Sequence, residues 1–194
     1  IGTAGGGLNL FDSETGRVTR FRHDPADPAS LPAGQVPSIY ADNRGTLWVG
    51  TESGLAEWRP ESGDFVRYGA SAGRRTALVH NRVNAMVQDA SGVLWVATHG
   101  GISAWNYFSD TFRYYSEAER FLVSDTVTSI AEARDGTVWV GTYGGGLSRL
   151  RLAAGEVRHF RHEPGDPGSL ADDRVMAVHV DSRDVVWVGT RNGG

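Results

Sequence analysis

The sequence has no cysteine among its 194 residues, which excludes a disulfide framework and any thiolate metal site. It has no apolar run of 18 or more residues, so no segment has the composition of a membrane-spanning helix. The 19 basic residues form no block or stripe, and the net charge is -4, which argues against a nucleic-acid surface. The lack of cysteine fits the cytosol and the periplasm equally, so composition alone does not choose a compartment.

Glycine and tryptophan are plentiful instead. The 26 glycines are roughly double the average usage, and six tryptophans are many for this length. Frequent turns combined with aromatic anchors indicate short strands rather than helices.

One short apolar segment recurs along the chain. It reads TLWVGT from Thr46, VLWVAT from Val93, TVWVGT from Thr137 and VVWVGT from Val185, and its tryptophans lie 47, 44 and 48 residues apart. The chain opens on IGT, the end of a further copy, so we expect the natural chain to begin upstream of Ile1. A strand that returns at a fixed interval is one part of a repeating unit.

Other columns keep the same phase. Twelve residues before each tryptophan stand Val36, Val83, Val127 and Val175, and ten before stand the small residues Ser38, Ala85, Ser129 and Ala177. Sixteen-residue segments from Gly16 and Gly155 agree at ten positions. Within them, His23 and His162 hold the same place, which predicts a turn role before the following DP and EP.

Each repeat divides into four predicted strands, which in the first complete copy lie near 36–42, 46–51, 54–59 and 64–69. An Asp–Gly turn separates the first two strands, as in Asp42 with Gly45. The third and fourth copies depart from this rule, with Ala133 at the Asp position and Asp184 at the Gly position.

Four-stranded antiparallel units that repeat every 44–48 residues predict an all-β fold, a β-propeller. We interpret residues 1–194 as one propeller segment of about four blade repeats, an open arc cut from a larger ring. The small residue of the first strand suits the narrow inner end of a blade. Trp48, Trp95 and Trp139 are predicted to be buried between blades, in phase with Trp187.

These residues resemble the two-component regulator propeller repeat of bacterial sensor proteins. The resemblance rests on Ser30-Leu31, Val36, the Asp42–Gly45 turn, the segment Leu47–Thr51 and Gly54-Leu55, with matching motifs from Gly141 and His162. Ala97, which replaces glycine in the second strip, is a local departure.

The resemblance implies a periplasmic sensor. Repeats of this kind form the extracytoplasmic part of membrane histidine kinases, hybrid regulators or diguanylate cyclases, and a whole ectodomain carries many more repeats. It implies a non-catalytic, ligand-sensing segment of a larger ectodomain, ahead of a kinase or cyclase module. No cofactor or metal is expected.

The candidate ligand-binding residues lie where the framework varies. One set follows each tryptophan strip and the other precedes each first strand, and antiparallel order places both on one face of the ring. They are Glu52, His99, Tyr143 and Arg191 after the strips, and Gln35, Arg82, Thr126 and Arg174 before the first strands. Arg82 and Arg174 suit a carboxylate or sugar acid, and Tyr143 suits a sugar ring, so a sugar-like or anionic small molecule is expected. Alternatively, these loop positions vary because nothing constrains them.

Two other functions remain open. An enzyme of the streptogramin-lyase type also repeats a Gly–x–x–Trp hairpin, but it needs a metal-dependent His/Glu cluster for which only His99 and Glu52 are candidates. A protein-interaction propeller would carry an exposed apolar patch, and unpaired edges of the arc would invite self-association. His159 and His162 alternate across a strand, which does not favour a shared metal.

Overall fold

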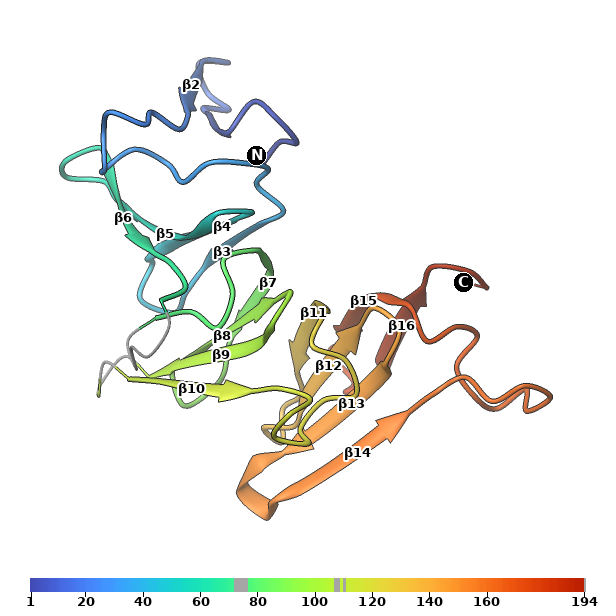
Figure 1. Ribbon diagram of the computed structural model, residues 1–194. Helices are drawn as coiled ribbons and strands as arrows, with labels where there is room; N and C mark the ends of the chain where they lie inside the picture. The colour runs from blue at the N-terminus through green and yellow to red at the C-terminus, as the bar shows by residue number, and fades with distance from the viewer. Residues whose placement is uncertain (72–76, 107–108, 110, 194) are drawn as a thin grey trace.

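The computed structural model describes residues 1–71, 77–106, 109 and 111–193 as a row of antiparallel sheets (Figure 1). Three sheets have four strands and two terminal sheets have two. We number the complete blades in chain order. Blade 1 contains β3 (Ser38–Ala41), β4 (Leu47–Thr51), β5 (Gly54–Arg59) and β6 (Asp64–Tyr68). Blade 2 contains β7 (Val83–Gln88), β8 (Val93–Thr98), β9 (Gly101–Asn106) and β10 (Thr111–Tyr115).

Blade 3 contains β11 (Val127–Glu132), β12 (Val138–Thr142), β13 (Gly146–Arg151) and β14 (Glu156–Phe160). A single 3₁₀ turn, η1 (Leu152–Ala154), interrupts the strands, and the described residues contain no α-helix. The predicted all-β fold of four-stranded antiparallel blades is confirmed. Within each blade the strands follow one another in order, and we call them a, b, c and d.

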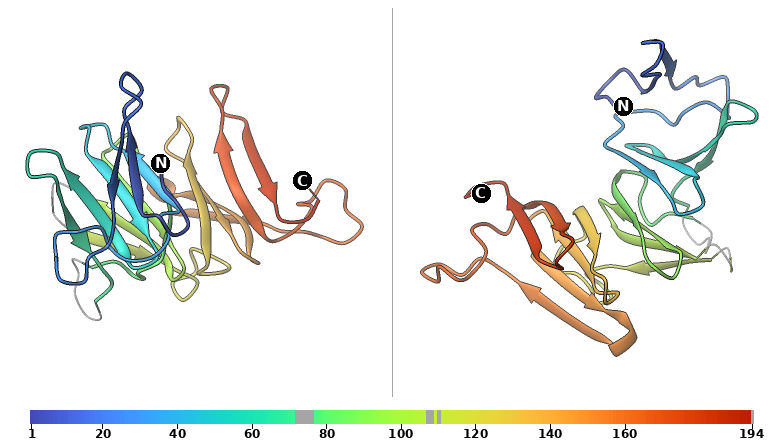
Figure 2. Two further views of the ribbon diagram at one scale, coloured as in Figure 1. Left: turned by 90° about the horizontal axis from the view of Figure 1, so that it is seen from above. Right: turned by 180° about the vertical axis from the view of Figure 1, so that it is seen from behind.

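The two ends of the chain are half-blades. The N-terminal half-blade holds β1 (Leu8–Phe11) and β2 (Val18–Phe21), which correspond to strands c and d. The C-terminal half-blade holds β15 (Val175–Val180) and β16 (Val186–Thr190), which correspond to a and b. These hairpins do not pair with each other, and their sheets lie apart at the two ends of an arc (Figure 2). The structure is therefore an open arc.

Strands a of successive blades lie side by side along the inside of the arc. Side chains near the start of these strands bond across the blade boundary: Asn84 Nδ2 donates to the carbonyl of Val127 at 2.6 Å, and Thr128 Oγ1 donates to that of Val175 at 2.7 Å. Small residues are needed here because strands a and b approach closely. A Cβ on Gly141 would meet Ser129 Oγ at 2.5 Å and a methyl of Val175 at 2.6 Å.

The tryptophan strips contribute large buried rings to the packing between blades. Trp48 and Trp95 are 2% and 3% exposed, and each packs on apolar residues of the following blade. Trp139 was also predicted to be buried, and this is wrong: it is only half-buried. Its neighbour is the C-terminal half-blade, and none of the described residues takes the place of the Trp105 and Phe112 rings that cover Trp48. Trp187, at the end of the arc, is 57% exposed.

A repeated threonine closes the turn between strands b and c. Thr51, Thr98 and Thr142 are fully buried, and each hydroxyl donates to a turn carbonyl at 2.8–3.0 Å. Thr3, in the partial repeat that opens the chain, makes the same bond to Gly7 at 2.8 Å. In the WVGT segment, the tryptophan therefore packs between blades and the threonine stabilises the turn that follows.

The turn role predicted for His23 and His162 is confirmed. His23 Nδ1 lies 3.0 Å from the carbonyl of Leu31, and His162 Nδ1 lies 2.6 Å from that of Leu170. These bonds close two long d–a loops of the same conformation, which we call loop A (residues 23–31) and loop B (residues 162–170).

Candidate functional site

The b–c turns and d–a loops share one face of the arc, which we call the loop face. In every blade a backbone hydrogen bond ties the two predicted site positions together. Four residues donate N–H to a carbonyl of the d–a loop at 2.8–3.2 Å, in the pairs Glu52–Gln35, His99–Arg82, Tyr143–Thr126 and Arg191–Arg174. Within each blade, the fold therefore places the candidate residue that follows the tryptophan strip beside the one that precedes strand a.

The first group of predicted residues is connected across the boundary between blades 1 and 2. Arg82 Nη1 lies 3.2 Å from Glu52 Oε1, and both side chains are partly exposed. The other oxygen of Glu52 accepts the backbone N–H of Gln35 at 3.2 Å. Glu52 is thus held between the cation of the next blade and a loop amide of its own blade. The Arg82 guanidinium therefore provides hydrogen-bond donors next to the Glu52 carboxylate, which is an acceptor.

A histidine pair extends this group. His80 and His99 stack with ring centroids 6.1 Å apart and an interplanar angle of 28°. Burial lowers the pKa of His99, and the nearby Arg82 cation and His80 add to this, while Glu52 acts in the opposite direction. The His99 ring is therefore held in its neutral form more firmly than a free imidazole, which leaves it one donor and one acceptor nitrogen at neutral pH.

The second group lies between blade 3 and the C-terminal half-blade. Arg191 donates to the phenol oxygen of Tyr143, and its guanidinium carbon lies 5.7 Å from the centroid of that ring. Arg174 is held by Asp172, with Nη2 2.6 Å from Oδ2. The hydrogen bonds from Arg174 lower the pKa of the Asp172 carboxyl to about 2. The Arg174 charge is thus matched by a carboxylate on its own loop.

Two members of these groups, His80 and Asp172, were not among the sequence-predicted residues. Both stand two positions before a predicted arginine and accept its backbone N–H, His80 at 3.0 Å and Asp172 at 2.8 Å. Ser124 does the same for Thr126 at 3.4 Å. A polar side chain that bonds the backbone two residues on is a known turn device, so the shared spacing was a usable signal.

The seven candidates thus form two groups rather than one ring of contacts. Gln35, Glu52, Arg82 and His99 are joined, and Tyr143, Arg174 and Arg191 are joined. Within the described part of the chain, the two groups share no hydrogen bond or ion pair.

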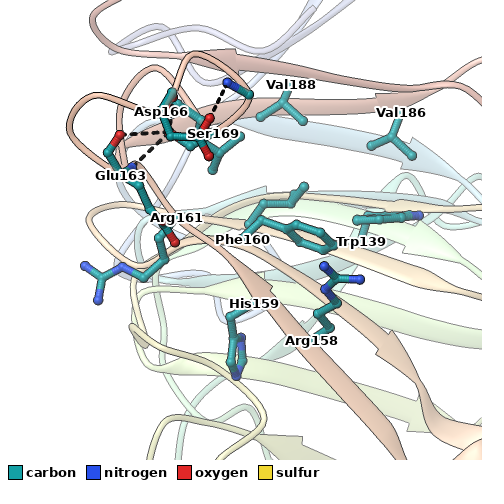
Figure 3. A pocket seen from close by; sticks show the side chains of 13 residues that line it. Trp139, Arg158, His159, Phe160, Arg161, Glu163, Asp166, Ser169, Val186 and Val188 are labelled. Carbon is teal, nitrogen blue, oxygen red and sulfur yellow. Dashed lines mark hydrogen bonds between the residues drawn. The ribbon is translucent and has the colours of Figure 1, made fainter.

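Cavities open elsewhere, at the boundaries between blades, and two of them adjoin tryptophans of the repeated strips. One of about 540 Å³ lies between blades 2 and 3, beside Trp95, Tyr115 and Leu152. Another of about 420 Å³ lies beside Trp139 and Phe160, facing the C-terminal half-blade (Figure 3). None of the seven candidates lines either cavity. In the described ranges no cluster of three or more His, Asp or Glu side chains is placed to hold a metal ion, and no helix there has the length and apolarity to cross a bilayer.

Comparison with known proteins identifies similar chains. Residues 30–53, 77–100 and 122–144 match the family model described as two component regulator propeller. A search of curated proteins gives no match.

Solved structures share the fold. The extracellular domain of a putative hybrid two component system from B. thetaiotaomicron is similar at a TM-score of 0.80 and 20% identity, over 97% of this chain and 24% of that one. A second such extracellular domain from the same organism gives 0.56 and 22%, over 99% and 30%. An inactive virginiamycin B lyase from Staphylococcus aureus, in a structure with quinupristin, gives 0.56 and 16%, over 79% and 48%. The chain therefore spans about a quarter to a half of the length of these proteins.

Proposed function

Because this chain carries repeats of the two component regulator propeller family, we propose that it is a non-catalytic, ligand-binding segment of a bacterial membrane sensor. The parent protein carries a kinase or cyclase module that reads the state of the propeller. Support comes from the family match and from the extracellular domains of two-component systems that share the fold. Their location also supports placing this segment in the periplasm.

The observation that carries the proposal is the polar bridging of blades on the loop face. Glu52 of blade 1 meets Arg82 of blade 2, and Tyr143 of blade 3 meets Arg191 of the C-terminal half-blade. A ligand that contacts such a pair touches two blades at once. Its binding energy then depends on how those blades sit relative to each other, which is what a sensor needs.

The pairing of charges favours one class of ligand. Arg82 and Arg174 are both opposed by carboxylates, so a free anion has to compete with Glu52 or Asp172 for them. A hydroxyl group is both donor and acceptor and can bond the guanidinium and the carboxylate together. The Tyr143 ring adds a face on which a sugar can lie. We therefore favour a polyhydroxylated, sugar-like ligand over a simple anion.

The test is titration calorimetry on the chain with a panel of neutral and acidic oligosaccharides. We expect binding to a neutral oligosaccharide that weakens at least about tenfold in Arg82→Ala or Tyr143→Ala, with little change in melting temperature. Arg183→Ala is the matched control, because Arg183 is an exposed arginine in the a–b turn of the opposite face. Loss of binding in Arg183→Ala with normal binding in the other variants would contradict the site.

The likeness to virginiamycin B lyase favours a second candidate, a propeller lyase that uses His99 and Glu52. The Arg82 guanidinium occupies Glu52 Oε1 and lies near His99, which opposes metal binding there because a bound cation would be repelled. Incubation of the chain with quinupristin and a divalent metal ion, followed by mass spectrometry, separates the two proposals. Cleavage of quinupristin would support the lyase.

A further inference from the structure

The boundary between blades 1 and 2 is closed by one row of side chains on blade 2. Residues opposite one another on neighbouring antiparallel strands project to the same side of a sheet. The row that faces blade 1 runs across strands a to d as Gln88, Leu94, Trp105 and Phe112. The Trp105 ring meets that of Trp48 in blade 1 edge to face, with centroids 5.2 Å apart. Both rings are buried, so two aromatic side chains fill this boundary.

The equivalent row on blade 3 is smaller. It runs across strands a to d as Glu132, Val138, Leu150 and Val157, so valine, leucine and valine stand where blade 2 has leucine, tryptophan and phenylalanine. The cavity of about 540 Å³ lies at this boundary. Blades 2 and 3 are neighbours in the arc (Figure 1), and each contains all four strands. The cavity therefore results from the side chains of blade 3.

The cavity has an apolar floor and an open mouth. Trp95 and Tyr115 of blade 2 form part of the floor, and their rings stack with centroids 5.2 Å apart at an angle of 29°. Val138 and the half-buried Leu152 line it from blade 3. The exposed a–b turns of both blades border the cavity, so a solute can enter from the face opposite the loop face. A volume of this size holds a small organic molecule.

The inner end of the cavity lacks a hydrogen-bond donor that blade 2 has. Gln88 Oε1 accepts the backbone N–H of Asn43 at 2.8 Å, and Gln88 Nε2 donates to the carbonyl of Gly92 at 3.0 Å. Glu132 repeats the first bond, because its Oε1 accepts the N–H of Ala90 at 3.2 Å. It cannot repeat the second, since an ionised carboxylate has no hydrogen to donate. Among the described residues, none donates to Oε2 of Glu132.

The charges around Glu132 favour a cation. Burial raises the pKa of its carboxyl, and the negative charge of Asp89 adds to this, while the hydrogen bond from Ala90 opposes it. Both oxygens of Asp89 are already bonded within its own blade. Arg113 also lines the cavity, but it lies on β10, the outermost strand of blade 2, and its side chain is exposed. Innermost and outermost strands of a blade lie about 14 Å apart, so the guanidinium is at the other end of the cavity.

We propose that this cavity binds a small arylalkylamine, with the ammonium at Glu132 and the aromatic ring over Val138 and Leu150. The ammonium supplies the N–H donor that the Gln88 amide supplies in blade 2, and the ring takes the place of Trp105. Adjacent strands are about 4.8 Å apart, so a short alkyl chain is sufficient to join the two groups. None of the seven loop-face candidates lines the cavity, so this site is separate from the one proposed above.

The first test compares 2-phenylethylamine with 2-phenylethanol by titration calorimetry on the 194-residue chain at pH 7. The two probes differ in charge and share the ring, and we expect the amine to bind at least about tenfold more tightly. Glu132→Gln should remove this preference without lowering the melting temperature, because glutamine is the residue that blade 2 has at this place. Glu61→Gln is the matched control, since it removes the same charge from an exposed position in the c–d turn of blade 1. It should keep the preference.

The second test locates the amine. The Trp95 indole N–H bonds Asp89, so its signal in a ¹H–¹⁵N spectrum should shift with 2-phenylethylamine in the wild type and not in Glu132→Gln. Leu152→Trp should fill the cavity and weaken binding at least about tenfold, whereas Arg82→Ala on the loop face should leave it unchanged. Absence of amine binding, equal affinity for the amine and the alcohol, or equal effects of Glu132→Gln and Glu61→Gln would overturn the proposal.

Discussion

Asp89 accepts a hydrogen bond from the indole nitrogen of Trp95 at 2.8 Å. Its other carboxylate oxygen accepts the backbone N–H groups of Ser91 and Val93, both at 2.9 Å. One aspartate therefore shapes the a–b turn and fixes the orientation of the ring that packs against the next blade. Asp42–Trp48 and Asp181–Trp187 repeat the bond at 3.0 and 3.2 Å, so the spacing Asp–x₅–Trp is a structural unit of the repeat.

Asp89→Ala should lower the free energy of unfolding by about 1–3 kcal/mol, because it leaves a largely buried indole N–H and two turn amides without their acceptor. Urea denaturation followed by tryptophan fluorescence measures this. Asp181→Ala is the control, since Trp187 is 57% exposed and water can replace the lost acceptor. Equal losses in the two variants would contradict this role for the buried bond.

Trp95→Ala should cost about 3–5 kcal/mol, the range for removing a large buried aromatic side chain. Trp139→Ala should cost less, because that ring is already half-open to solvent beside the cavity at loop B. The same denaturation experiment compares them. A larger loss in Trp139→Ala than in Trp95→Ala would mean that the half-blade boundary packs more tightly than its exposure indicates.

The fold was predictable from the sequence because every blade solves the same packing problem and therefore repeats the same residues in phase. The burial of Trp139 was mispredicted. The position of a residue in the repeat shows where it lies within its own blade, whereas its burial depends on the residues of the neighbouring blade. The turn partners Asp172 and His80 were missed for a related reason. Their chemistry differs from copy to copy, as histidine, serine or aspartate, and only their spacing from the d–a loop arginine or threonine is shared.

Gly141→Ala should destabilise the chain by about 1–3 kcal/mol, in the range for overpacking a core. An added Cβ would lie within 2.6 Å of both Ser129 Oγ and a methyl of Val175. Ala97 occupies the equivalent position of blade 2 opposite Ala85 rather than serine, so Ser129→Ala should recover part of the loss. Differential scanning calorimetry of the single and double variants checks this, and a double variant as unstable as Gly141→Ala would refute the steric explanation.

Acidification should destabilise the chain through His99. Burial lowers the pKa of this imidazole in the folded state below the ordinary histidine value of about 6.5, so below that pH the unfolded chain binds the proton more readily than the folded chain does. Stability is therefore lost as pH falls from about 6.5 towards the folded pKa. His99→Gln should flatten this part of the curve in urea denaturation at pH 5–8. Curves that differ only by a constant offset would contradict the assignment.

The ion pair between Arg174 and Asp172 should weaken the binding of acidic ligands at this site. Arg174 Nη2 lies 2.6 Å from Asp172 Oδ2, and the pKa of Asp172 is lowered to about 2. The carboxylate therefore stays ionised throughout the physiological range and offsets the charge of the guanidinium. Asp172→Asn removes the negative charge. The group then consists of two cations, Arg174 and Arg191, and the phenol of Tyr143. We expect this variant to bind acidic oligosaccharides more tightly than the wild type, and to bind neutral ones no better.

Calorimetry at two salt concentrations checks the electrostatic origin, because a gain produced by an exposed charge should shrink as ionic strength rises. Asp173→Asn is the matched control: Asp173 is the adjacent aspartate, but it pairs with Arg161, 2.8 Å away, and lies outside the Tyr143 group. A gain in both variants would show a general effect of net charge. A gain confined to Asp172→Asn would place the anion at Arg174, and no gain in either would remove Arg174 from the site.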